Sequence, residues 1–157
     1  MKITVLCSGK TTYDYIKKGF QYYASRINHY FTFAEAYTET LKNSRNIPVE
    51  MIKTKESELL MKNILPGSVV VLLDENGTMY KSKEFAAFLQ QQANNSVKQL
   101  VFCIGGPYGF SDNMLKKASY KISLSKMTFS HQLVRLIFAE QLYRACTILK
   151  GEPYHHE

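Results

Sequence analysis

The run SVVVLL at residues 68–73 constrains the fold of this chain more than any other stretch of its sequence. After its first residue the run is apolar at every position, which is typical of a strand buried on both faces of a sheet. Strand-like segments alternate with helix-like segments along the chain. That alternation predicts an α/β fold with a mainly parallel sheet and helices on both faces.

The spacing of apolar residues locates the elements. Strands are predicted at residues 2–6, 31–37, 68–73, 99–104 and 120–123. Helices are predicted at residues 13–27, 49–64, 82–94, 112–118 and 130–150. The polar stretch 38–48 predicts a loop, and Asp74 to Gly77 predicts a turn that ends the third strand.

Length and composition limit the class of protein. The 157 residues predict a single domain over 1–157, large enough to bury a core. No apolar run approaches the roughly 20 residues that cross a bilayer, and the opening MKITVLCSGK is too short in apolar residues for a secretory signal. We therefore expect a cytoplasmic protein with no membrane association. Cys7, Cys103 and Cys146 lie in apolar stretches, which favours buried free thiols, and no Cys/His spacing predicts a metal site.

Positive charge is concentrated near the C-terminus. Between Asn113 and Gly151 lie seven basic residues and a single acidic one, Glu140, so this segment carries most of the net charge of +7. A concentrated basic surface favours a polyanionic partner such as RNA or DNA. A solvated basic face without a partner is the alternative.

Three loops are expected at one edge of the sheet, because the carboxyl ends of parallel strands lie together and ligands collect there. They follow Leu73, Ile104 and Ser123. The loop after Ile104 reads GGPYGF and matches neither the dinucleotide pattern nor the phosphate-loop pattern. Glycines and free backbone groups suit an adenosine, or the cationic S-adenosylmethionine, better than a phosphate. A tight turn without a ligand is the alternative.

The segment SLSKMTF at 123–129 interleaves apolar and polar residues directly before the last helix, with Ser130 as the expected N-cap. Such a segment is suited to wrap a nucleoside, or is simply a capped connection. The helix that follows carries apolar residues around much of its circumference, which predicts burial against its own sheet on one side and a second subunit on the other. Glu140 and Arg144 are spaced for an ion pair along that helix.

The chain ends in GEPYHHE, an unusual sequence for a terminus. Tyr154 is suited to stack on a base, and a histidine is the side chain best placed to move a proton near neutral pH. A frayed end or the remnant of a purification tag is the alternative.

Several of these motifs together resemble one known family. IGGPYG, SLSKMTFSHQLVR, AEQLYRA and GEPYHH, in this order, resemble the ribosomal RNA large-subunit methyltransferase H family of the SPOUT superfamily. The resemblance spans the chain and is strongest after Val101. It implies a cytoplasmic homodimer with a C-terminal trefoil knot that binds S-adenosylmethionine without a metal. It also implies methylation of N3 of a pseudouridine in 23S rRNA, in the large subunit or the whole ribosome.

Carried over by motif, the resemblance implies a methyl-donor site made of Leu73, Gly105, Leu124, Ser125, Lys126, Met127, Thr128 and Phe129. Arg144 and the pair Tyr154 and His155 also match family positions. His156 stands where members of the family often have arginine or lysine, and Ser130 stands where they often have proline.

For this chemistry we expect His155 to act as, or to orient, the general base. Tyr154 is expected to pack on the nucleobase. Basic residues of the C-terminal quarter, Arg135 and Arg144 among them, and His156 are expected to contact the RNA. Two other hypotheses fit part of the sequence: a non-catalytic RNA-binding module of the ribosome-assembly type, and an enzyme acting on a small nucleotide.

Overall fold

The computed structural model describes residues 1–41 and 44–156. Its five strands form a single parallel sheet in the order β2-β1-β4-β3-β5. The strands are β1 (Lys2–Cys7), β2 (Thr32–Tyr37), β3 (Val69–Met79), β4 (Gln99–Ile104) and β5 (Tyr120–Ser123). The helices are α1 (Asp14–Ile27), α2 (Val49–Lys62), α3 (Ser82–Asn94), α4 (Asp112–Lys117) and α5 (Leu133–Lys150), with a short 3₁₀ turn, η1 (Ser44–Asn46). The predicted α/β fold is therefore confirmed.

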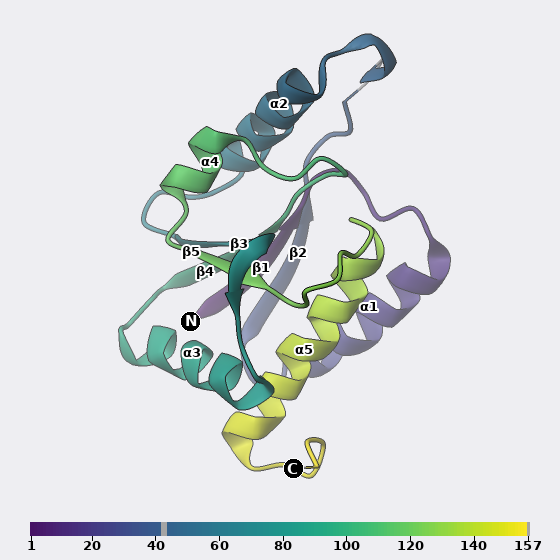
Figure 1. The fold of residues 1–157 in the computed structure, drawn as a ribbon. Coiled ribbons are helices and arrows are strands. Elements are labelled where there is room, and N and C mark those ends of the chain that lie inside the picture. The colour runs from purple at the N-terminus through teal and green to yellow at the C-terminus, as the bar shows by residue number, and fades with distance from the viewer. Residues whose placement is uncertain (42–43, 157) are drawn as a thin grey trace.

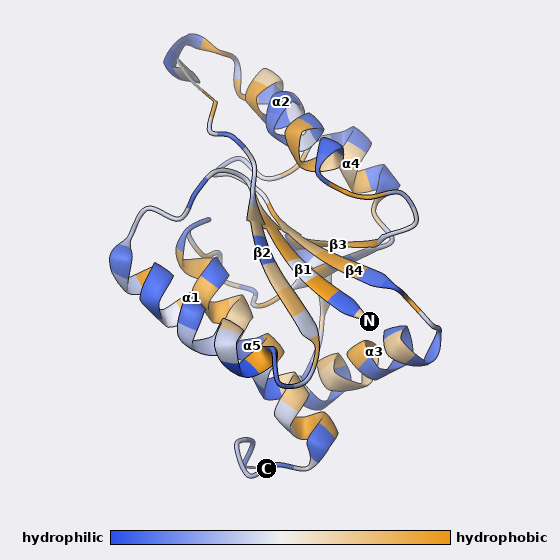
Figure 2. Cartoon of the chain, turned by 180° about the vertical axis from the view of Figure 1, so that it is seen from behind, coloured by the Kyte–Doolittle hydropathy of each residue, from blue (hydrophilic) through white to orange (hydrophobic). Residues whose placement is uncertain are grey.

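Helices cover both faces of the sheet, as predicted. α2 and α4 lie on one face, and α1, α3 and α5 lie on the other (Figure 1). Alternate residues of the same strand supply the two cores: Val5 belongs to the larger cluster with α1, α3 and α5, whereas Leu6 belongs to the smaller one with α2 and α4. The hydropathy colouring shows the central strands as the most apolar part of the chain (Figure 2).

Helix α5 owes its broad apolar surface to neighbours within the chain. It packs against α1 on one side and α3 on the other, while its middle residues Phe138 and Leu142 are fully buried against the sheet. A second subunit is therefore not needed to explain most of that surface, and the homodimer stays a prediction. The trefoil knot also stays a prediction.

The third strand does not end at Leu73 as predicted, because β3 continues to Met79. Residues 74–77 do change the course of the chain, since the last part of β3 leads back toward α3 (Figure 1). Leu73 and Thr78 both pair with Ile122 of β5, so residues 74–77 bulge out of the ladder as an arch between two parallel pairings. We call residues 74–77 the β3 arch. The run of Asp, Glu, Asn and Gly has turn-like composition, and here it forms an outward loop within one strand.

Smaller differences concern element ends. The last helix begins at Leu133 rather than Ser130, but the Ser130 side chain still caps it, since Leu133 N donates to Ser130 Oγ at 3.1 Å. The loop predicted at 38–48 includes residues 42 and 43, which lie outside the described residues, and its later part holds η1. The three cysteines are buried and free, as predicted. Within the described ranges, no helix is both long and apolar enough to cross a membrane.

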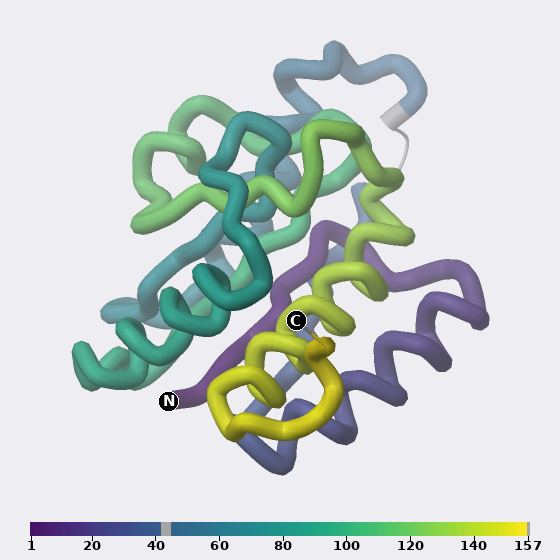
Figure 3. The backbone as a smooth tube through the Cα atoms, turned by 60° about the horizontal axis from the view of Figure 1, so that its bottom comes forward, coloured from purple at the N-terminus to yellow at the C-terminus, as the bar shows by residue number. Residues whose placement is uncertain are grey.

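The β3 arch crosses β5 at very short range, and Gly77 makes that crossing possible. A Cβ atom on Gly77 would lie 2.5 Å from Ile122 N and 2.6 Å from the carbonyl carbon of Lys121. Both atoms belong to the backbone of a paired strand, so neither moves easily. Figure 3 shows the segments that follow β3 and β5 side by side.

We therefore predict that Gly77→Ala lowers the free energy of unfolding by about 3 kcal/mol or more, because overpacking against a backbone cannot be relieved by rotating a side chain. Urea denaturation followed by circular dichroism measures this loss. Gly67→Ala is the matched control: it places a Cβ in open space at a positive φ of 79° and should cost only about 1 kcal/mol. Equal losses in the two variants would contradict the backbone clash.

Candidate functional site

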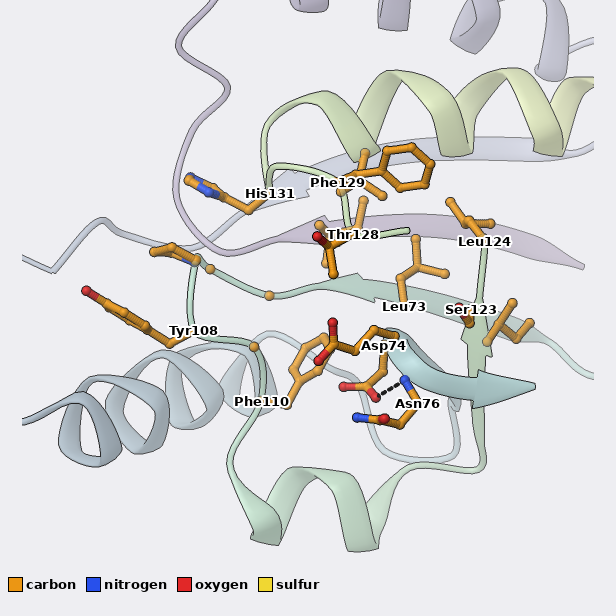
Figure 4. Close-up of a pocket in the computed structure, with 18 of the residues that line it drawn as sticks. Leu73, Asp74, Asn76, Tyr108, Phe110, Ser123, Leu124, Thr128, Phe129 and His131 are labelled. Atoms are coloured by element: carbon orange, nitrogen blue, oxygen red, sulfur yellow. Dashed lines mark hydrogen bonds between the residues drawn. The ribbon is translucent and has the colours of Figure 1, made fainter. Parts of the chain in front are cut away.

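A cavity of about 410 Å³ opens at the carboxyl ends of β3, β4 and β5. It is formed by the three loops that the sequence analysis expected to converge, those after Leu73, Ile104 and Ser123. The N-terminal turn of α5 closes one side through His131 and Val134. In Figure 4, Thr128 and Phe129 lie on one side of the cavity, and Asp74 and Phe110 lie on the other.

The glycine loop is a tight turn that also lines the cavity. Gly109 N donates to Gly106 O at 3.1 Å, which closes a four-residue turn with Pro107 at its second position and Tyr108 at its tip. Gly109 has a φ of 77°, a conformation that favours glycine. The turn and the ligand, which were alternatives at the level of sequence, are therefore compatible in this structure.

The segment after β5 is held by short polar contacts of its serines. Ser123 Oγ donates to Ser125 O at 2.9 Å, and Met127 N donates to Ser125 Oγ at 3.0 Å. These bonds turn the chain back toward the sheet edge, and the residues on either side then line the cavity. Seven of the eight residues expected at a donor site do so: Leu73, Gly105, Leu124, Ser125, Met127, Thr128 and Phe129. Lys126 is exposed and does not line it.

Several lining residues were missed by sequence reasoning. They include Lys53, Asp74, Asn76, Tyr108, Phe110 and His131. Tyr108 and Phe110 belong to the glycine loop and Asp74 directly follows Leu73, so extending each loop by a few residues would have found them. Lys53 comes from α2, and no local signal in the sequence connects that helix with the sheet edge.

The electrostatic character of the cavity is set by carboxylates. Asp74 and Glu75 line it, and Asp74 Oδ1 accepts a hydrogen bond from Asn76 N at 2.9 Å. Lys53 is paired with Glu50 at 3.4 Å. Burial, together with the nearby Arg135 charge, lowers the pKa of His131 below its ordinary value, so this imidazole is neutral at pH 7.

The residues present fit an adenosine-type ligand. The volume lies in the range of small-molecule sites, which are mostly apolar with a few polar groups. Phe110 and Phe129 supply aromatic surface, and the glycine turn and the serine-rich segment bring backbone N–H and C=O groups to the wall. Within the described ranges, no cluster of His, Cys, Asp or Glu is arranged to hold a metal ion.

Arg135 is not an RNA contact in this structure, which corrects the sequence-based expectation. Its side chain is completely buried and donates four hydrogen bonds of 2.9–3.0 Å. The acceptors are the carbonyl oxygens of Ser8, Gly9 and His131 and the hydroxyl of Thr11. A guanidinium enclosed in this way cannot reach a phosphate. Instead it ties the end of β1 to the turn that begins α5.

The C-terminal tail lies far from the cavity of its own chain. An α-helix rises about 1.5 Å per residue, so the 18 residues of α5 separate the two by about 27 Å. Figure 1 shows the tail at the end of α5 that lies away from the carboxyl ends of the strands. Within one chain, therefore, Tyr154, His155 and His156 are not brought together with the donor-site residues.

The tail is instead docked on the distal half of α5. The Tyr154 ring packs edge-on against Tyr143 with centroids 4.8 Å apart, and its hydroxyl donates to Glu140 Oε1 at 3.1 Å. Arg144 lies over the same ring and pairs with Glu140 at 2.5 Å, which confirms the predicted ion pair. Burial raises the pKa of the Tyr154 phenol, so it stays protonated at neutral pH.

Comparison with known proteins agrees with this geometry. Residues 1–155 match the family model described as predicted SPOUT methyltransferase. The Ribosomal RNA large subunit methyltransferase H of Phocaeicola vulgatus is 50% identical over 157 residues, which covers all of both chains. The protein of the same name from Christiangramia forsetii is 48% identical over 99% of each chain.

The chain belongs to the ribosomal RNA large subunit methyltransferase H family. A solved structure described as a probable methyltransferase from Bordetella pertussis shares the fold of this family member, with a TM-score of 0.54 at 8% identity. That likeness covers 92% of this chain and 95% of the other. Membership of the family confirms the resemblance that the glycine loop, the serine-rich segment and the tail had indicated.

We predict that Arg135→Lys lowers the free energy of unfolding of this family member by about 3 kcal/mol, because a lysine cannot reproduce the forked donors and leaves buried carbonyl groups unpaired. Urea denaturation measures the loss. Arg144→Lys, at a partly buried ion pair on the same helix that keeps its charge in this variant, is the control and should cost less than about 1 kcal/mol. A loss for Arg135→Lys no larger than that of the control would overturn the structural role.

Proposed function

We propose that this protein transfers a methyl group from S-adenosylmethionine to the RNA of the large ribosomal subunit. In its finer form, the acceptor is N3 of a pseudouridine in 23S rRNA, within the large subunit or the assembled ribosome. The protein is proposed to act as a cytoplasmic homodimer. The names of the relatives, which describe methyltransferases of large-subunit ribosomal RNA, support the acceptor class.

The observation that carries the proposal is the convergence of residues from three loops on one cavity. The family match alone gives a set of positions in the sequence. The structure brings seven of these eight positions to one cavity of about 410 Å³ beside a tight glycine turn. A non-binding connection has no need of such a cavity.

The reaction requires the protein to position the two reactants and to supply one proton acceptor. The bound donor supplies an electrophilic methyl group on a sulfonium. The N3–H of the pseudouridine gives its proton to a base, N3 forms a bond to the methyl carbon, and the carbon–sulfur bond breaks with its electron pair left on sulfur. Holding the two reactants in line provides most of the acceleration, and a general base adds about 10²–10⁴-fold.

A second copy of the chain is the proposed source of the base. The tail cannot reach its own cavity across about 27 Å of α5. In a two-fold dimer with antiparallel α5 helices, the end of one helix lies beside the beginning of the other. Tyr15 and Tyr22 on α1 are 62% and 53% exposed, and Leu133 at the start of α5 is 36% exposed. Aromatic and aliphatic surface of this kind on adjacent helices supports self-association.

The two rival functions receive less support. A non-catalytic RNA-binding module rests on the basic C-terminal quarter, but Arg135 is buried there and Arg144 is paired with Glu140. An enzyme for small phosphorylated nucleotides needs cations in the cavity, and Lys53 is already paired with Glu50 while Asp74 and Glu75 face the same space. Neither rival accounts for the glycine turn and the carboxylates together.

We expect labelled methyl groups from S-adenosylmethionine to appear in 23S rRNA when the protein is given ribosomes or large subunits that lack the modification. Mass mapping of the product should locate the label on N3 of a pseudouridine. Small subunits from the same cells are the control substrate. Calorimetry without any binding heat for S-adenosylmethionine would favour the RNA-binding module instead.

We further expect His155→Ala to lower the single-turnover methylation rate about 10²–10⁴-fold, because the proton acceptor is lost. The affinity for S-adenosylmethionine should stay the same, since the cavity is untouched. His156→Ala is the control for loss of a neighbouring imidazole and should slow the step much less. A near-normal rate for His155→Ala removes this residue from the proposed role.

A mixed dimer tests which chain supplies the tail. In Gly105→Val the added side chain starts 3.3 Å from the backbone of Gly109 and from the Phe110 ring, two lining residues that it would displace, so this variant should not bind the donor. Alone, it and His155→Ala should each be inactive. Refolded together they should regain about a quarter of wild-type activity, because half of the dimers then carry one intact composite site. No recovery would mean that tail and cavity of the same chain work together.

A further inference from the structure

The cavity is acidic within a basic protein. The whole chain carries a net charge of +7, and seven basic residues lie between Asn113 and Gly151, the segment that forms one wall. Yet the charged side chains among the described lining residues are Lys53, Asp74 and Glu75. A cavity for phosphate would place cations on its wall, so the carboxylates indicate a different ligand charge.

Two lining residues, Lys53 and His131, are able to carry positive charge. Lys53 is held by Glu50 at 3.4 Å. His131 is neutral at pH 7, because burial and the Arg135 charge oppose its protonation. Arg135 is enclosed by three carbonyl oxygens and a hydroxyl and does not line the cavity. The anionic groups of the wall are therefore Asp74 and Glu75, and a cation is favoured at the end of the cavity where they lie.

Asp74 is the carboxylate with a fixed orientation. Its Oδ1 accepts a hydrogen bond from Asn76 N at 2.9 Å, a local turn that holds the side chain on the β3 arch. The structure gives its second oxygen, Oδ2, no hydrogen-bonding partner within the part of the chain that it describes. Figure 4 shows Asp74 between Leu73 and Phe110, on the wall of the cavity opposite Thr128, with its carboxylate beside Asn76. Glu75, by contrast, is exposed at the rim.

We propose that the Asp74 carboxylate attracts the positive charge of the methyl donor, so that the cavity binds the donor more tightly than the demethylated product. This inference rests on the proposed function of the cavity. S-adenosylmethionine and S-adenosylhomocysteine share their nucleoside and their amino-acid end, and differ in the methyl group and the sulfonium charge. A carboxylate a few ångströms from the sulfur attracts the sulfonium of S-adenosylmethionine. It has no such attraction to the neutral thioether of S-adenosylhomocysteine. Methyl transfer thus removes the attraction, which favours exchange of product for fresh donor.

The size of the preference follows from the partly open setting of Asp74. Attraction between unit charges a few ångströms apart is stronger in such a cavity than in bulk water and weaker than in a dry interior. We expect about a tenfold effect on affinity, which corresponds to about 1.4 kcal/mol. The attraction is also screened by salt, so the preference of the wild-type protein should decrease as ionic strength rises.

Calorimetric titration of the full-length protein with three ligands tests the proposal. Asp74→Asn keeps the side-chain shape and the oxygen that accepts from Asn76, and removes only the charge. It should weaken binding of S-adenosylmethionine about tenfold and leave S-adenosylhomocysteine within about twofold. Sinefungin, whose amine keeps a positive charge beside the sugar without a transferable methyl group, should behave like the methyl donor.

Glu58→Gln, which removes an exposed carboxylate on α2, controls for the change in net charge and should alter none of the three affinities. Circular dichroism verifies the fold of each variant, and the salt dependence of the wild-type preference needs no variant at all. An equal loss for all three ligands would overturn the proposal, because it would assign Asp74 to the shared ribose or α-ammonium group. A loss for Glu75→Gln but not for Asp74→Asn would overturn it as well.

The same titrations distinguish failure of the proposed function from failure of the role of Asp74. Absence of heat with every ligand and the wild-type protein would contradict the donor site itself, and with it this inference. Heat with all of them, unchanged by Asp74→Asn, would contradict only the role of Asp74.

Discussion

The guanidinium of Arg135 joins the carboxyl end of β1 to the beginning of α5, and the shape of the cavity depends on this junction. Its donors satisfy the carbonyl oxygens of Ser8 and Gly9 at the sheet edge and that of His131 four residues earlier in the chain. Gln132 strengthens the same junction, since Thr12 N donates to Gln132 Oε1 at 2.9 Å and Gln132 Nε2 donates to Lys10 O at 3.2 Å. The serine-rich segment before α5 is thereby kept over the ends of β3 and β4, where it forms a wall.

A second constraint is the close crossing of the β3 arch and β5. Because Gly77 has no side chain, the arch can lie against the backbone of Lys121 and Ile122. That contact fixes Asp74 on the opposite side of the cavity from Thr128. The two constraints act on different walls of the cavity. Arg135 positions the segment that is suited to hold a nucleoside, and Gly77 positions the Asp74 carboxylate, which is suited to attract the sulfonium charge of the donor. Binding and charge selection are therefore separable by mutation.

Sequence reasoning succeeded where a signal is local. Short apolar runs bounded by turn residues predict the strands at 68–73 and 99–104, and the observed β3 and β4 contain residues 69–73 and 99–104. The ion pair of Glu140 and Arg144 follows from helical spacing. It failed where a residue's neighbours are distant in sequence. Arg135 looks like any surface arginine of a basic segment, and only its contacts with Ser8, Gly9 and Thr11, more than 120 positions away, make it structural.

What the sequence by itself determined is the alternation of strands and helices, the convergence of three loops at one sheet edge, and the family to which the motifs belong. These depend on hydrophobic periodicity and on short motifs, which any segment carries within itself. The tertiary structure alone decided that the third strand continues through the β3 arch to Met79, that Arg135 is buried, and that the tail lies a full helix length from its own cavity. Each of these depends on which distant backbone groups come within reach of one another, and that is fixed only when the sheet has formed and its two faces are covered.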